Sequence, residues 1–315
     1  MTVSRENLEA HLEKVRSAVR DPRQGLYGPS SLVWRVNREQ ILFLAGARAA
    51  LLQEAHPFVA HGVDQHSLAK ADPIGRFQRT FKHVHAMIFG DLESALTSAR
   101  RVHTFHTKVR GSIGENTGTY AKGSFYQAND EQALLWVHAT IWESSVMAYE
   151  LFFGPLSPDE RERYYQETKL FAYLFGIPEA ILPPNYSEFM AYNEKMWASP
   201  DLGVESTAHE MAEIILSPAN PLQRHLTGWN RVLTAGFLPP RFRDAYRLAF
   251  GKKERATFDA SVRALRTIWP LVPRQIRFVP AYLVALERMG QAVVPTLAER
   301  LVTRVLPQPQ LFAPS

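Results

Sequence analysis

The chain of 315 residues contains no cysteine. Disulfides, thiolate nucleophiles, iron–sulfur clusters, cysteine-rich zinc sites and cysteine-ligated haem are therefore excluded. Long apolar runs are also lacking, because the longest fall far short of the ~18 residues that a membrane-spanning helix needs. The start of the chain, Met1 to Asn7, is polar and has no apolar signal core. We therefore expect a soluble, cytoplasmic protein with no transmembrane segment.

A strongly basic stripe is lacking as well. The formal net charge is +5, and the lysines and arginines alternate with acidic residues. This distribution makes nucleic acid an unexpected partner. Hydrophobic residues make up 46% of the chain and charged residues 21%, a balance typical of a globular protein with a large core.

Strand-like alternation does not persist anywhere, whereas apolar residues recur at helical spacing. The spacing and the capping residues predict helices over 4–20, 30–53, 59–69, 91–109, 129–154, 157–176, 185–197, 204–216, 221–236 and 239–250, a helix starting at Asp72-Pro73, and two more in the C-terminal third. We predict a single all-α domain over 1–315. Residues 1–24 would be an N-terminal extension, and 306–315 a flexible tail. The polar stretch 111–128 is expected to form a long loop that could gate a site.

One histidine, His138, lies in an apolar helix. Leu134, Leu135, Ile141 and Trp142 lie three or four residues away and share its helix face, so the imidazole points into apolar surroundings. One interpretation is a core histidine that a backbone carbonyl satisfies. The other is an axial haem ligand, because a neutral imidazole in a dry pocket binds iron well.

Upstream, Arg76, Arg79 and Thr80 have i, i+3, i+4 spacing and share one helix face. Such donors could stabilise negative charge on iron-bound oxygen, or an arginine fork could hold a haem propionate. The alternative is a solvated basic face paired with nearby acids.

Two further groups of polar residues accompany these. His103 and His106 are three residues apart on one helix face, and we favour a pocket role for His106 over direct metal binding. A packed or capping role is the alternative for both. Glu54, His56, His61 and His66 cluster before the arginine helix, as a cavity wall, a cofactor entrance or turn caps. No Glu-x-x-His motif is present, which argues against a di-iron carboxylate bundle.

The ordered motifs resemble the catalytic domain family of rubber oxygenases and MpaB-type oxygenases. They are His56-Pro57, Gly62-Val63, His66-Ser67, Arg76-x-x-Arg79-Thr80, Val102-x-x-x-His106-x-x-Val109-x-Gly111, Tyr126-x-Ala128-x-Asp130 and Leu135-Trp136-Val137-His138-Ala139. The likeness covers roughly residues 25–250 in motif order and spacing.

The resemblance implies an all-helical fold around a buried pocket for haem b. In it, His138 matches the proximal iron ligand, and Arg76 and Thr80 match the distal arginine and threonine. It also implies cleavage of isoprenoid carbon–carbon double bonds with dioxygen, and a catalytic glutamate for which Glu54 is a candidate. Arg79 departs from the lysine of the latex-clearing protein. A guanidinium has no lone pair for iron, so Arg79 is expected to add positive charge or bind a propionate.

We therefore predict a haem b-dependent oxygenase that uses dioxygen on a small hydrophobic, isoprenoid-like metabolite. The predicted catalytic residues are Arg76, Arg79 and Thr80. The predicted cofactor-binding residues are His138, Arg76, Arg79 and His106, with His138 on the iron. A haem-binding sensor or carrier without turnover, and a cofactor-free helical binding protein, stay open. A homodimer also stays open: the amphipathic residues 293–305 would form a dimer face, a membrane-surface helix or, as we favour, ordinary packing.

Overall fold

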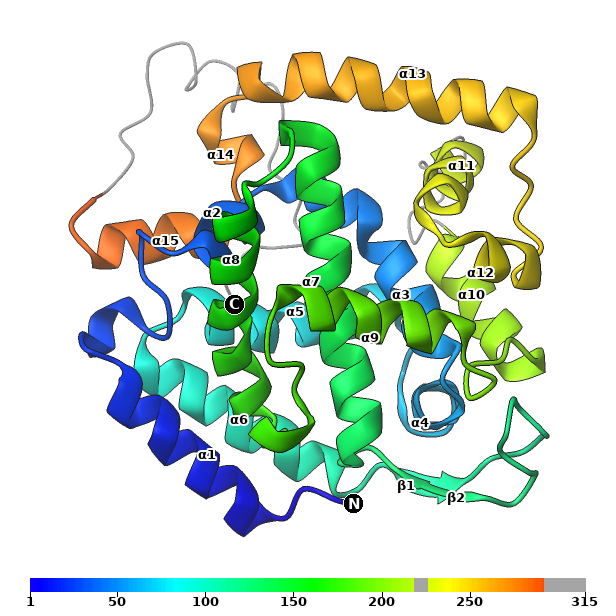
Figure 1. Cartoon of the computed structure of the whole chain (residues 1–315), viewed down its shortest axis with the longest axis horizontal. Helices are drawn as coiled ribbons and strands as arrows, with labels where there is room; N and C mark the ends of the chain where they lie inside the picture. The colour runs from blue at the N-terminus through cyan, green and yellow to red at the C-terminus, as the bar shows by residue number, and fades with distance from the viewer. Residues whose placement is uncertain (218–225, 292–315) are drawn as a thin grey trace.

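The computed structural model describes residues 1–217 and 226–291. Within these ranges the fold is built from α-helices that pack around one large core, with two smaller apolar clusters beside it (Figure 1). The helices of the first half are α1 (Arg5–Ala18), α2 (Leu32–Asn37), α3 (Gly46–Glu54), α4 (Pro57–His66), α5 (Pro73–Phe89), α6 (Leu92–His106) and α7 (Glu131–Phe153). Those of the second half are α8 (Pro158–Leu174), α9 (Tyr186–Ala198), α10 (Ser206–Leu216), α11 (Thr227–Phe237), α12 (Pro240–Ala245), α13 (Lys252–Ile268), α14 (Arg274–Arg277) and α15 (Pro280–Arg288).

Short elements complete the fold. Four 3₁₀ turns occur within the described ranges: η1 (Pro22–Gln24), η2 (Gln40–Ala45), η3 (Glu179–Ile181) and η5 (Trp269–Leu271). Two short strands, β1 (Arg110–Ser112) and β2 (Phe125–Gln127), pair antiparallel, with Gly111 opposite Tyr126. The predicted all-α, single-domain fold is confirmed.

Helix α7 runs through the middle of the molecule (Figure 1). It packs against α3, α8, α9 and α13, which explains why its sequence is apolar on most of its circumference. Trp136 and Trp142 are fully buried on it. The indole nitrogen of Trp136 donates to the carbonyl of Leu52 at 2.9 Å, so the large ring is packed without losing its hydrogen bond.

Helix starts follow the capping residues that the sequence presents. Asp72 accepts a hydrogen bond from Gly75 N at the start of α5, with Pro73 at the first helical position. Ser157 and Glu160 form a capping box at the start of α8. His56-Pro57 separates α3 from α4, because a residue before proline disfavours helical backbone angles.

The predicted helix over 30–53 is wrong in its middle, where α2, η2 and α3 replace it. Glu39 is drawn out of the helix by distant partners. Its backbone bridges to Phe278, and its buried carboxylate accepts hydrogen bonds from Arg277 (2.7 Å) and the Trp269 indole (3.0 Å). Local sequence carries no sign of contacts more than 200 residues away.

Other boundaries also shift. The predicted loop 111–128 contains most of the β1–β2 hairpin, and the predicted helix over 239–250 shortens to α12. Within residues 1–24, α1 packs on α8 and α6, and its Leu8, Leu12 and Val15 join the main core. The amphipathic stretch 293–305, the tail 306–315 and part of the predicted helix 221–236 lie outside the described residues. In the part of the chain that is described, no helix is long and apolar enough to cross a membrane.

Candidate functional site at the open end of the α5–α6 hairpin

Helices α5 and α6 form an antiparallel hairpin around Gly90 and Asp91 and pack closely on each other. Asp91 caps α6 by accepting from Ser94 N at 2.7 Å. Arg76 lies 14 residues before Gly90 (90 − 76) and His106 lies 15 after Asp91 (106 − 91). At a rise of 1.5 Å per residue both are about 20 Å from the turn. The fold therefore brings Arg76 and His106 to the same level, at the open end of the hairpin.

The predicted trio on α5 is arranged unevenly. Arg76 is half-buried, and its Nε donates to Ser67 Oγ at 2.8 Å, so the residue after α4 positions it. Arg79 points back to the start of its own helix, where Nη1 lies 3.0 Å from Asp72 Oδ2, and its side chain is 55% exposed. Thr80 is exposed. All three residues lie on α5, and Arg76 is held in place by the side chain of Ser67, which lies outside that helix.

His106 ends α6 with a ring nitrogen available for bonding. Its Nδ1 is shielded from solvent and has no hydrogen-bond partner among the described residues. Loss of solvation lowers the pKa of His106 to about 4, against an opposing hydrogen bond with the Asn129 side chain. The imidazole is therefore neutral at physiological pH. In its neighbour His103, by contrast, Nε2 is hydrogen-bonded to the carbonyl oxygen of Val3 at 3.0 Å.

His138 lies in the first third of α7, buried against α8. Its ring contacts Trp142 and Phe171, and burial lowers its pKa to about 3. The Trp142 indole N–H donates to His138 Nδ1 at 3.1 Å. An indole nitrogen can only donate, so Nδ1 accepts, and the proton of the neutral ring belongs on Nε2. That Nε2 has no partner in the described ranges. In this arrangement iron could bind Nε2 only if the Trp142 contact broke or the ring turned.

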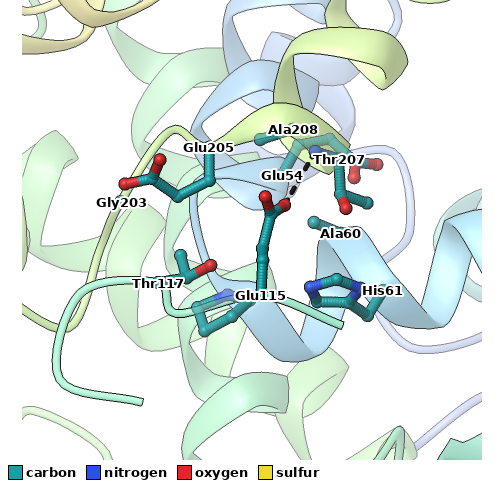
Figure 2. Close-up of a pocket in the computed structure, with 10 residues that line it drawn as sticks. Glu54, Ala60, His61, Glu115, Thr117, Gly203, Glu205, Thr207 and Ala208 are labelled. Atoms are coloured by element: carbon teal, nitrogen blue, oxygen red, sulfur yellow. Dashed lines mark hydrogen bonds between the residues drawn. The ribbon is translucent and has the colours of Figure 1, made fainter. Parts of the chain in front are cut away.

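A second group of titratable residues surrounds a narrow pocket of about 160 Å³. Figure 2 shows its lining, drawn from the end of α3 (Glu54), from α4 (His61), from the loop between β1 and β2 (Glu115), and from the start of α10 (Thr207). Glu115 Oε1 accepts from Thr207 N at 2.9 Å, which ties the loop to α10. The side chains leave essentially no room in it even for a water molecule, whereas typical cofactor sites offer about 300 Å³ or more, so it would not itself enclose a haem.

Glu54 has the most perturbed carboxyl of this group. It is 4% exposed, and its Oε2 has no hydrogen-bond partner within the described part of the chain. Desolvation raises the pKa of Glu54 to about 7, with the charge of Arg76 opposing the shift and that of Asp64 adding to it. Buried His61 has an unpartnered Nε2, and desolvation lowers its pKa. Glu54 therefore holds or releases a proton near neutral pH, within the field of Arg76.

This perturbation predicts a pH-dependent gain in stability for Glu54→Gln. Folding raises the pKa of the carboxyl from 4.5 to about 7, so the folded state binds the proton more tightly than the unfolded state. The cost of ionising Glu54 is absent below pH 4.5 and complete above pH 7. Relative to the native chain, the variant should gain about 3 kcal/mol in unfolding free energy between pH 5 and pH 8. Urea unfolding across that range measures it. An unchanging difference would contradict the raised pKa.

The ordered motifs imply haem as the cofactor. A haem needs only one protein side chain as an iron ligand, because the porphyrin supplies the other iron ligands. The shielded, unpartnered Nδ1 of His106 meets that requirement. Arg76 supplies a cation at the same level of the hairpin, suited to a propionate carboxylate. The donor chemistry of His106 and Arg76 therefore suits a haem, and these are the residues that would hold it at the open end of the hairpin.

The sequence presented Glu54 as one of four polar residues before the arginine helix and as a candidate for the catalytic glutamate that the resemblance implies, with no sign of its shifted pKa. The signal that could have found it is its place three residues after Leu51, on the buried face of α3. A carboxyl on an apolar face is a sign of a shifted pKa. The buried ion pair of Arg48 on α3 with Glu143 on α7 was also missed, since the two lie 95 residues apart.

Comparisons with known proteins agree with the motif order. Two uncharacterized proteins, of Mycobacterium bovis and Mycobacterium tuberculosis, are each 24% identical to this chain over 239 residues, which is 74% of this chain and 90% of theirs. No solved structure matches the chain. Residues 34–267 match the family described as "ER-bound oxygenase mpaB/B'/Rubber oxygenase, catalytic domain". This stretch spans the hairpin, the Glu54 pocket and α7, and the chain belongs to that oxygenase family.

Proposed function

We propose that the protein is a haem b-dependent oxygenase that uses dioxygen on a small hydrophobic, isoprenoid-like metabolite. Its membership of an oxygenase catalytic domain family supports the reaction class. The observation that carries the haem assignment is the neutral, unpartnered imidazole of His106, level with Arg76 at the open end of the α5–α6 hairpin.

For the iron ligand we propose His106 in preference to His138. The ring of His138 already accepts the Trp142 N–H, so binding iron would require that contact to break or the ring to turn. His106 has no such contact to break, because its Nδ1 has no hydrogen-bond partner among the described residues. Its hydrogen bond with Asn129 also fits the support that metal-bound imidazoles usually receive. The assignment of His138 as the iron ligand stays a prediction from the sequence. Haem titration of His106→Ala and His138→Ala distinguishes the two assignments.

The haem, when bound, supplies the iron that activates dioxygen. Arg76 would fix one edge of the group and, with Thr80, donate hydrogen bonds where negative charge develops. Arg79 would add positive charge from its place beside Asp72. Glu54, whose pKa is about 7 near the charge of Arg76, would donate or accept a proton when the charge at this site changes.

The hydrophobic substrate has support in exposed apolar side chains beside the site. Leu68 follows Ser67, the partner of Arg76, and is 59% exposed. Phe105 precedes His106 and is 56% exposed, and Phe125 on β2 is 60% exposed. An apolar ligand could cover such side chains if they form one surface with the site. The cytoplasmic location and the homodimer stay predictions.

The test is haem titration of the purified protein followed by oxygen-uptake measurements with short isoprenoid hydrocarbons. A saturable Soret band and substrate-dependent oxygen consumption with carbonyl products are expected. Haem binding without any product would indicate a sensor or carrier. A protein that stays colourless after haem addition would contradict the proposal and favour a cofactor-free binding protein. Arg76→Gln should weaken haem binding or slow turnover, while Arg163→Gln on the exposed face of α8 should change neither.

A further inference from the structure

The outward face of α6, away from its buried face, contains a hollow with an excess of positive charge. Its lining consists of Thr97, Arg100, Arg101 and Thr104 from α6, together with Arg5 from the start of α1. The four α6 residues have i, i+3, i+4, i+7 spacing, so they form one stripe on the helix surface. The hollow is open and offers about 360 Å³, near the lower end of the size range of small-molecule sites.

The carboxylate of Glu9 contacts two of these three guanidinium groups, those of Arg5 and Arg100. Glu9 accepts from Arg5 Nε at 2.7 Å and from Arg100 Nη2 at 2.8 Å, and the same contacts lower the pKa of Glu9. Arg101 is exposed and has no ion-pair partner among residues 1–217 and 226–291. Three cations against one anion leave a net charge of +2 around the hollow.

The hydrogen-bond donors of the hollow are also only partly used. Glu9 occupies Nε of both Arg5 and Arg100 and one terminal nitrogen of Arg100, while Arg5 Nη1 makes only a long contact of 3.4 Å with Thr104 Oγ1. The remaining guanidinium nitrogens, with the hydroxyl of Thr97, surround an open space. Guanidinium forks match the oxygens of a phosphate group, and a phosphate dianion matches a charge of +2.

We propose that this hollow on α6 binds the phosphate group of a small phosphorylated molecule. Arg101 and Arg100 would contact the phosphate oxygens, with Arg5 and Thr104 at its edge, and the organic part would occupy the rest of the hollow. The site is separate from the open end of the α5–α6 hairpin, because His106 lies on the buried face of α6 and the hollow on the exposed one. It does not depend on the haem assignment.

The experiment is a calorimetric titration of the full chain with pyrophosphate and with inorganic phosphate at constant ionic strength, using acetate as the reference anion. Saturable binding of one pyrophosphate per chain is expected, with phosphate weaker and acetate not saturating. Arg101→Gln should weaken binding about tenfold or more, since a bidentate charge-assisted contact is lost. Arg263→Gln, an exposed arginine on α13, removes the same charge elsewhere and should leave the affinity unchanged.

A second variant tests whether Glu9 competes with the ligand for the guanidinium groups of Arg5 and Arg100. Glu9→Gln removes the competing carboxylate and frees nitrogens of Arg5 and Arg100, so pyrophosphate should bind several-fold more tightly. Circular dichroism confirms that each variant is folded. Equal losses in Arg101→Gln and Arg263→Gln would reduce the effect to overall charge and overturn the proposal. The same conclusion would follow from binding that does not saturate, or from a Glu9→Gln variant with unchanged affinity.

Discussion

Replacing His106 with alanine is expected to remove haem from the protein, with a loss of affinity of more than about 100-fold. Changing only the hydrogen-bond partners of a metal ligand already costs 10- to 100-fold in other metal sites, so loss of the ligand itself costs more. His106 offers a shielded and unpartnered Nδ1 at the end of α6. Haem titration followed at the Soret band measures the affinity.

Two histidines provide matched controls. His103→Ala lies on the same helix and removes a ring whose Nε2 contacts the Val3 carbonyl, so it should lower stability but keep haem affinity. His138→Ala leaves the Trp142 indole without its acceptor and opens a cavity, at a cost of about 2–4 kcal/mol in unfolding free energy. The folded fraction of this variant should still bind haem.

Added imidazole separates ligation from folding. If His106 binds iron, free imidazole should enter the space left in His106→Ala and restore the Soret band of the native protein. Full haem occupancy in His106→Ala together with loss in His138→Ala would reverse the assignment and place the iron on α7. Loss of haem in neither variant would show that neither imidazole is the required ligand.

The buried pair of Arg48 and Glu143 is expected to dominate the stability of the central helices. Arg48 on α3 is 2% exposed and donates to Glu143 and Ser144 on α7 and, at 2.9 Å, to the Phe237 carbonyl on α11. Glu143→Gln would leave the guanidinium buried without a counter-charge. We expect a loss of about 3–5 kcal/mol in unfolding free energy, measured by urea denaturation.

The control for this prediction is the same substitution at an exposed pair. Glu213 binds Arg231 with two contacts of 3.1 Å and is 64% exposed, so Glu213→Gln should cost less than about 1 kcal/mol. The double variant Arg48→Met with Glu143→Leu should regain most of the stability lost in Glu143→Gln, because no buried charge remains. Similar losses in Glu143→Gln and Glu213→Gln would contradict a dominant role for the buried pair.

Much of the helical framework follows from local sequence. Asp72 with Pro73, and Ser157 with Glu160, start α5 and α8 as their capping chemistry predicts, and the apolar run around Trp136 gives the buried helix α7. These features depend on residues within one or two turns of each other. The break between α2 and α3 does not, because it depends on Phe278 and Arg277 reaching Glu39 across the chain.

The candidate site divides in the same way. Sequence spacing placed Arg76, Arg79 and Thr80 on one helix and His106 on the next, and the resemblance supplied haem as their expected cofactor. Spacing could not separate their roles. Arg76 is held by Ser67, whereas Arg79 turns to Asp72 and leaves its side chain in water. Which rotamer an arginine adopts depends on neighbours from other segments.

The sequence by itself therefore determined the helical class, the absence of thiol chemistry and the set of residues able to hold a haem. Only the tertiary structure decided which of them have free ring nitrogens and shifted pKa values. Trp142 uses the lone pair of His138, while the same fold leaves Nδ1 of His106 open and buries Glu54 near the charge of Arg76. The desolvation of a group and the use of its hydrogen-bonding atoms depend on all the segments that surround it. Spacing along one helix specifies only its neighbours on that helix.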